Sequence, residues 1–104
     1  MTALGRLAAW YQRQCDEDWE HSHGVRIESC DNPGWWVKID VRGTRLDTVA
    51  FNRRVENVDA EGWHQGPRWL HCHVIDGVWN GAGDETRLEQ IIELFLAWAE
   101  QHNS

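Results

Sequence analysis

Two segments of the sequence gather residue types that catalyse reactions or bind metals. Residues 15–24 read CDEDWEHSHG and hold one thiol, four carboxylates and two imidazoles. Residues 71–73 read HCH and place a cysteine between two histidines. Carboxylates and imidazoles act as general acids and bases, and together with thiolates they bind transition metals. These segments raise three hypotheses: a metal site, a catalytic site and a binding surface.

A calcium site is the first hypothesis that the spacing tests. Asp16, Asp18 and Glu20 resemble the start of a calcium-binding loop. Such a loop requires a glycine at its sixth position and a bidentate glutamate at its twelfth. Here those positions are His21 and Ile27, so the calcium interpretation is excluded.

A transition-metal site would use the two His-x-His pairs. His21 and His23 form one pair, and His71 and His73 form the other. Neither pair belongs to a recognised ligand motif, and histidines that make ordinary hydrogen bonds are the favoured interpretation. We therefore predict no metal and no cofactor, and a small metal-dependent hydrolase built on these four histidines stays as the alternative function.

Catalytic motifs give no support to an enzyme. The sequence holds no nucleophile elbow, phosphate-binding loop, dinucleotide fingerprint or zincin helix. The glycines of GAGDETR precede a predicted helix, but Asp84 and Glu85 occupy the positive helix end and would repel a phosphate. We predict no catalytic residues.

Two helices are predicted at the ends of the chain. Leu4, Leu7 and Tyr11 recur at helical spacing, and the acids after Cys15 are unfavourable at a helix C-terminus, so this helix should end near residue 14 or 15. The second helix begins at TRLE, residues 86–89, which matches a capping box, and continues with an apolar stripe.

Four strands are predicted between the helices. Residues 24–30 and 35–43 alternate apolar and polar side chains on either side of the turn sequence DNPG, which predicts a hairpin. A weaker strand covers residues 49–55 and another covers residues 68–75, whereas residues 76–83 form a glycine-rich connection with room for a brief strand. The order α-β-β-β-β-α predicts an α+β domain, in which the N- and C-terminal helices pack on one face of an antiparallel sheet of about four strands.

A binding surface is the hypothesis that these elements favour. Clustered carboxylates accelerate association with a basic partner, and an aromatic side chain anchors it. Trp19 is either that anchor or a structural pin of its loop, whereas the strand alternation places Trp36 on the uncovered face of the sheet. The residues expected to bind the partner are Asp16, Glu17, Asp18, Glu20, His21, His23 and Trp36.

Composition restricts the class of protein further. A chain of 104 residues has apolar surface for one core, so residues 1–104 are expected to form a single domain. The formal net charge of −7 opposes direct nucleic-acid binding, and no apolar run approaches the roughly 20 residues that cross a bilayer. Three cysteines without a CxxC pair favour reduced thiols, and the N-terminus lacks a signal-peptide pattern. We therefore expect a cytoplasmic protein.

The order of these motifs resembles the immunity protein 53 family of bacterial polymorphic toxin systems. The resemblance rests on Trp10-Tyr11, the CDEDWEH segment, Gly24-Val25 and the DNPGW turn, and it extends through DGVWNGAG to the final helix. Glu17 stands where a glycine is common, and residues 46–66 match less well.

This resemblance implies a cytoplasmic protein without catalytic residues that binds and neutralises a cognate toxin domain, protecting the producing cell and its kin. The acidic charge suggests a basic toxin such as a nuclease. A general protein-binding adaptor outside toxin systems is the other alternative.

Overall fold

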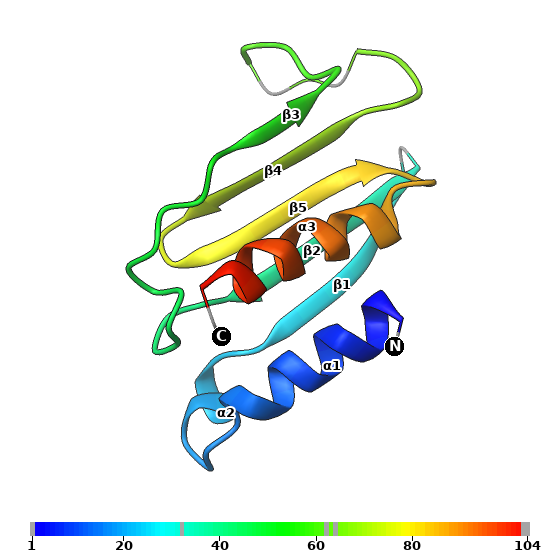
Figure 1. The fold of residues 1–104 in the computed structure, drawn as a ribbon. Helices are drawn as coiled ribbons and strands as arrows, with labels where there is room; N and C mark the ends of the chain where they lie inside the picture. Colours follow the sequence, from blue (N-terminus) through cyan, green and yellow to red (C-terminus); the bar gives the residue numbers. More distant parts are fainter. Residues whose placement is uncertain (1, 32, 62, 64, 103–104) are drawn as a thin grey trace.

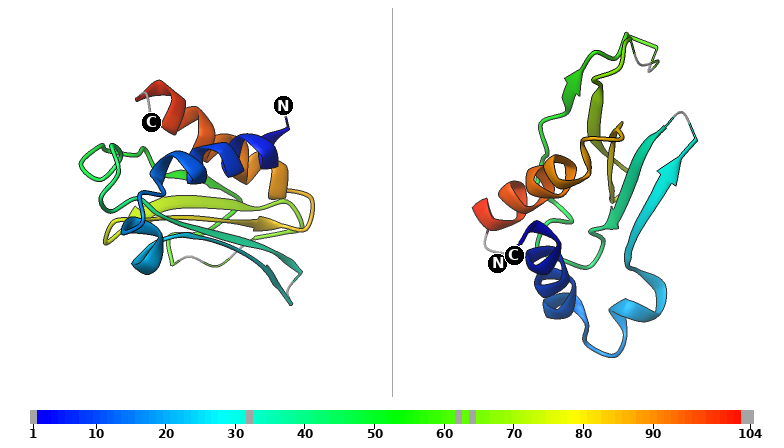
Figure 2. Two further views of the ribbon diagram at one scale, coloured as in Figure 1. Left: turned by 90° about the horizontal axis from the view of Figure 1, so that it is seen from below. Right: turned by 90° about the vertical axis from the view of Figure 1, so that its right-hand side faces the viewer.

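The computed structural model of the chain describes residues 2–31, 33–61, 63 and 65–102. Within this part of the chain, a five-stranded antiparallel sheet in the order β1-β2-β5-β4-β3 forms one layer, and two long helices form the other (Figures 1 and 2). A short helix lies between α1 and β1. The elements are α1 (Ala3–Gln14), α2 (Trp19–Ser22), β1 (Val25–Cys30), β2 (Gly34–Asp40), β3 (Arg54–Glu56), β4 (Leu70–Ile75), β5 (Val78–Asp84) and α3 (Leu88–Gln101).

The predicted α+β class is confirmed, but the strand count changes because β5 is a complete strand. Residues 78–84 pair with β2 on one side and with β4 on the other. A glycine-rich run is typical of a loop. Here the glycines serve packing, since a Cβ at Gly81 would lie 2.5 Å from Cγ2 of Ile91, and a Cβ at Gly83 would lie 2.8 Å from Cβ of Arg87. Both neighbours belong to the start of α3, so the missing side chains let this helix lie against the central strand.

The predicted third strand is wrong in length, because only Arg54–Glu56 forms β3. The segment before it is irregular and packs into the core instead. The ring of Phe51 lies 5.8 Å from Trp79 and 5.2 Å from Trp98, and the Trp98 indole N–H donates to the carbonyl of Ala50 at 3.0 Å. These residues contact α3 and β5, and they do not extend the pairing of β3 with β4.

Aromatic side chains join the two layers. Phe95 of α3 meets Trp10 of α1 edge-to-face at 4.9 Å between ring centroids and Trp79 of β5 at 5.3 Å, and all three side chains are fully buried. Arg6 extends the contact between the helices at the surface, where its guanidinium binds Glu93 at 3.0 Å and Glu100 at 2.6 Å. None of the helices in the described part of the chain has the length and apolar character required to cross a bilayer.

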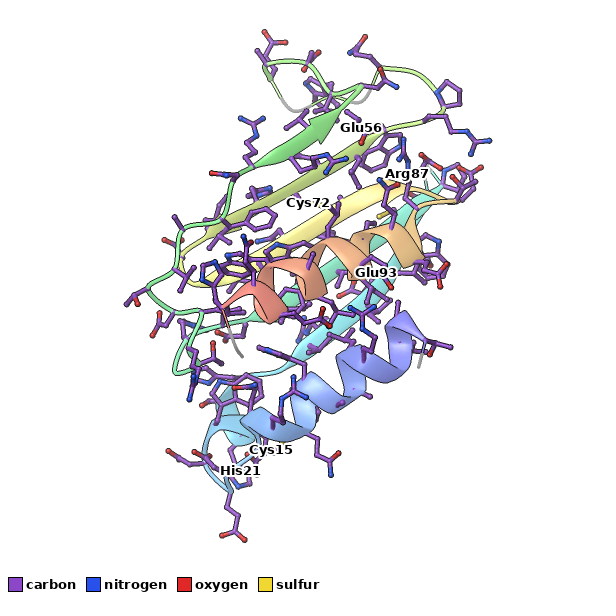
Figure 3. The ribbon with its side chains drawn as sticks, viewed as in Figure 1. Cys15, His21, Glu56, Cys72, Arg87 and Glu93 are labelled. Atoms are coloured by element: carbon purple, nitrogen blue, oxygen red, sulfur yellow. The ribbon has the colours of Figure 1, made fainter. Side chains whose placement is uncertain are left out.

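The predicted capping box at the start of α3 is wrong. The hydroxyl and the backbone N–H of Thr86 bind Asp84, and the N-cap residue of α3, Arg87, makes no side-chain capping bond. The sequence predicted that Asp84 would repel an anion at this helix end. Asp84 is only 1% exposed, so it does not face an incoming anion. It accepts bonds from the Trp69 backbone N–H and from Nε of Arg87, whose Nη2 binds Glu56 of β3 at 3.1 Å (Figure 3). A carboxylate desolvated here needs these donors, which is why Thr86 is recruited away from the helix.

We expect Gly81→Ala to lower the free energy of unfolding by about 2 kcal/mol, because the added methyl group overlaps Ile91 and the Trp79 ring. Urea denaturation followed by circular dichroism measures this change. Gly24→Ala is the matched control, since nothing lies within 4 Å of its Cβ position, and it should change stability by less than about 0.5 kcal/mol. Equal effects of the two substitutions would contradict the packing role of Gly81.

We expect Asp84→Asn to cost about 3 kcal/mol at neutral pH, because it removes the buried charge partner of the half-buried Arg87 and leaves the more exposed Glu56 to pair with it. Although burial opposes the charged form, the hydrogen bonds of Thr86 and Arg87 lower the pKa of Asp84 from 3.8 to about 2. As the pH falls, Asp84 is therefore protonated in the unfolded chain before it is protonated in the folded one. The contribution of the charged Asp84 to stability is lost as the pH falls from about 4 through about 2. Urea titrations at pH 7, 4 and 2.5 should show this loss in the wild type and in the exposed control Glu85→Gln, and a smaller loss in Asp84→Asn.

Candidate functional site

Two of the four predicted steering carboxylates shape their own loop. Residues 16–20, here called the acidic segment, connect α1 to the start of α2. Oδ1 of Asp16 accepts the backbone N–H groups of Asp18 at 3.0 Å and Trp19 at 2.8 Å, and Glu20 accepts those of Asp16 at 2.9 Å and Glu17 at 2.8 Å. The N–H of Trp19 is the main cause of a lowered pKa at Asp16, and the N–H of Glu20 itself is the main cause of a lowered pKa at that residue. Both carboxylates are thus charged at neutral pH and turned toward the backbone.

The other two carboxylates face outward. The side chains of Glu17 and Asp18 are exposed and accept no hydrogen bond from the described residues. Glu17 has a φ of 75°, in the left-handed region that disfavours side chains other than glycine. It therefore presents its charge at the tip of the segment at a cost in backbone strain.

Trp19 is the structural pin of this segment. Its side chain is 7% exposed, and its indole N–H donates to the carbonyl of Arg42 at 2.7 Å. Its ring lies 6.2 Å from Trp10 and 5.9 Å from Tyr11. A side chain held in this way contributes to the core and leaves no surface for a partner.

The two His-x-His pairs lie in different parts of the fold. His21 is exposed on α2. The ring of His23 lies 5.8 Å from that of Trp19 in a tilted arrangement, and its Nδ1 contacts the Ser22 hydroxyl at 2.8 Å. His71 and His73 lie on β4 with their rings 4.5 Å apart, and desolvation is the main cause of a lowered pKa at both.

The four histidines of the two pairs therefore do not form one metal site. Three strand spacings, about 14 Å, separate β1 from β4. Figure 3 shows His21 beside Cys15 at the end of α1, and it shows Cys72, the residue between the other two histidines, away from them on β4. No group of three His, Cys, Asp or Glu side chains among the described residues is placed to hold a metal ion.

Trp36 lies on the face of the sheet opposite the helices, as the strand alternation predicts. Its side chain is 42% exposed, whereas its neighbour Val37 is fully buried on the helix side. The strand register extends this surface in two rows across four strands. We call it the open face, and its residues are Glu28, Trp36, Ala82 and His71 in one row and Arg26, Lys38, Asn80 and His73 in the other. In Figure 2 both helices lie on the other side of the sheet.

Lys38 is the cation next to Trp36 on this face. Its Nζ lies 4.1 Å from the centroid of the Trp36 ring, within the range of a cation–π interaction. The ammonium group therefore covers part of the indole and orients it. The exposed ring is held on a rigid strand, which reduces the entropy lost when a partner binds it.

A polar hollow of about 470 Å³ lies at the α2 end of the open face. Its walls come from the end of α2 and from β1, β2 and β5. The residues that line it are Ser22, His23, Gly24, Val25, Arg26, Lys38, Asp40, Arg42 and Val78. Of these lining residues, the sequence predicted His23 alone as a site residue. Arg26 and Lys38 were missed because their significance depends on being paired across β1 and β2, and the DNPG turn is the signal that gives this register.

The structure thus brings some predicted site residues together and keeps others apart. His23 reaches the hollow, and the acidic segment lies at the same end of the sheet, since the N–H of Asp40 donates to the carbonyl of Gly24. Trp36 lies four residues further along β2, about 13 Å away. A single partner of ordinary interface size spans this distance.

Comparison with known proteins gives the family. A family model described as Immunity protein 53 matches residues 4–100, nearly the whole chain. The chain belongs to the immunity protein 53 family. It is therefore an immunity protein of a toxin system, with a toxin as the implied partner.

The other comparisons add little to this assignment. The immunity protein is similar to the Arabidopsis thaliana protein AGENET DOMAIN (AGD)-CONTAINING P1, with 34% identity over 64 residues. That match covers 62% of this chain but only 12% of the plant protein. No solved structure matches the chain significantly.

We expect Glu17→Gly to stabilise this immunity protein by about 1 kcal/mol, because glycine removes the strain of a left-handed side chain at the position where the family resemblance suggests glycine. Thermal unfolding measures the change. Asp18→Gly is the control, since Asp18 has a φ of −130° and should lose stability through the flexibility of glycine. A destabilising Glu17→Gly would contradict the strained conformation.

Proposed function

We propose that this immunity protein neutralises a cognate toxin of a bacterial polymorphic toxin system by stoichiometric occlusion in the cytoplasm of the producing cell. The immunity protein 53 assignment supports the toxin as partner. The observation that supports occlusion is the exposed Trp36 on a sheet face that neither long helix covers. Binding there would cover the active site or an essential surface of the toxin.

The arrangement of the surface supports a division of roles. Trp36 supplies apolar contact area from a rigid strand, which is typical of a residue that contributes much of the binding energy. Glu17 and Asp18 are solvated and unpaired within the described residues, so they act on the encounter rate with a basic region of the toxin. Asp16 and Glu20 contribute the same sign of charge and keep the segment in shape. His21 and His23 are secondary polar contacts at its edge.

The first experiment tests the activity itself. The toxin domain encoded beside this gene is expressed in a susceptible cell with and without the immunity protein. We expect growth only in the presence of the immunity protein, and a purified complex of one copy each by light scattering. If cells that express both proteins do not grow and the purified toxin does not bind the immunity protein in vitro, the proposal is overturned.

We expect Trp36→Ala to weaken the complex by about 30-fold, or about 2 kcal/mol, while leaving the fold intact, because the side chain is exposed in the free protein. Surface plasmon resonance gives the affinity and circular dichroism checks the fold. Trp63→Ala is the matched control: Trp63 is 70% exposed in the connection between β3 and β4 and should have no effect. If Trp36→Ala binds like the wild type, the interface lies away from the open face.

A further inference from the structure

Two cations lie directly opposite each other on the open face. Arg26 of β1 is paired with Lys38 of β2 in the antiparallel register. Like charges at paired positions destabilise a sheet. Neither side chain forms an ion pair with any described residue, and Asn80, the next residue in the row, is uncharged. The protein has a net charge of −7, yet no carboxylate among the described residues forms an ion pair with either cation.

The carboxylate that lines the hollow does not neutralise Arg26 and Lys38. This carboxylate, Asp40, is fully engaged by Arg42, which donates to Oδ1 from Nε at 3.0 Å and to Oδ2 from Nη2 at 2.7 Å. Although desolvation of this 8% exposed residue opposes its charged form, the side-chain bond from Arg42 contributes to a lowered pKa of Asp40, so the two charges compensate each other. Arg26 and Lys38 are left as uncompensated cations at the wall of a 470 Å³ space that is open to solvent.

We propose that this hollow binds a carboxylate, and specifically an aspartate or glutamate side chain of the toxin. The guanidinium of Arg26 supplies a planar pair of donors for a carboxylate, and Lys38 supplies a second positive charge from the facing strand. The assignment rests on the proposed function for the source of the carboxylate. It also refines the partner, whose surface then presents an acidic side chain beside the basic region that meets the acidic segment.

A carboxylate fits this site better than a phosphate does. Glu28 lies two residues from Arg26 on the same face, and the acidic segment lies at the same end of the sheet. These charges and the total of −7 oppose a multiply charged or polymeric anion but tolerate a single charge. The ring of Trp36 under Lys38 adds an apolar neighbour for the methylene groups of an acidic side chain.

The free protein gives the first test. Arg26→Gln should raise the melting temperature by about 2 °C, because it removes the repulsion with Lys38. Arg45→Gln is the control, an exposed cation of the connection between β2 and β3 whose loss should leave the melting temperature unchanged or lower it. Sodium acetate at fixed ionic strength should shift the NMR signals of the Arg26 Nε–H and Trp36 indole N–H groups in the wild type but not the indole signal in Arg26→Gln. A melting temperature lowered by Arg26→Gln, or no acetate response, would overturn the site.

The complex with the toxin gives the second test. Arg26→Glu should weaken toxin binding by about 30-fold, mainly through faster dissociation, and a toxin variant with one interface acid changed to Arg should restore it. Binding within twofold of the wild type would overturn the site while leaving the proposed function intact. If the wild type binds no toxin, the proposed function fails, and the acetate titration still decides whether the hollow binds a carboxylate. A response to inorganic phosphate without one to acetate would overturn the choice of a carboxylate.

Discussion

Helix α3 lies so close to strand β5 that Ile91 occupies the space that a Cβ at Gly81 would need. This approach places Phe95 between Trp10 and Trp79, so one helix connects α1 to the centre of the sheet. It also brings Arg87 to the buried Asp84 and to Glu56 of β3, which ties the start of the helix to both sides of β4. The packing of α1, the position of the irregular segment before β3 and the end of β5 all depend on this one contact.

A helix layer that packs this tightly on one face leaves the opposite face without a cover. Sheets of this kind alternate buried and solvated side chains, and β2 does so between Val37 and Trp36. On this face two cations, Arg26 and Lys38, lie at paired positions, and the indole of Trp36 is exposed. The open face therefore combines an apolar anchor with uncompensated charge, and both properties favour recognition of another protein over stability of the free chain.

The segment CDEDWEHSHG first suggests a reactive centre because of its residue types. The structure shows that Asp16 and Glu20 bind backbone N–H groups and that Trp19 is buried. The histidines of this segment lie before β1, which two strands separate from β4 and its histidines. Only Glu17 and Asp18 keep their carboxylates free within the described residues, and they do so at the tip of a strained turn. In the function proposed for this immunity protein, the segment contributes charge and Trp36 of β2 contributes the apolar contact.

The sequence by itself determined the elements whose signal is local. The helix of Leu4, Leu7 and Tyr11, the hairpin around DNPG and the exposed position of Trp36 follow from periodicity and turn chemistry, which depend only on neighbouring residues. Only the tertiary structure decided that the glycines of β5 form a central strand, that Thr86 binds Asp84 and does not cap α3, and that Phe51 leaves the sheet for the core. The pairing of β5 and the position of Phe51 depend on partners distant in sequence, as does the hollow beside Arg26 and Lys38. Thr86 binds a near neighbour, but it does so because the packed layers bury the Asp84 carboxylate. Local propensity carries no information about such partners, because their energies arise only when the layers meet.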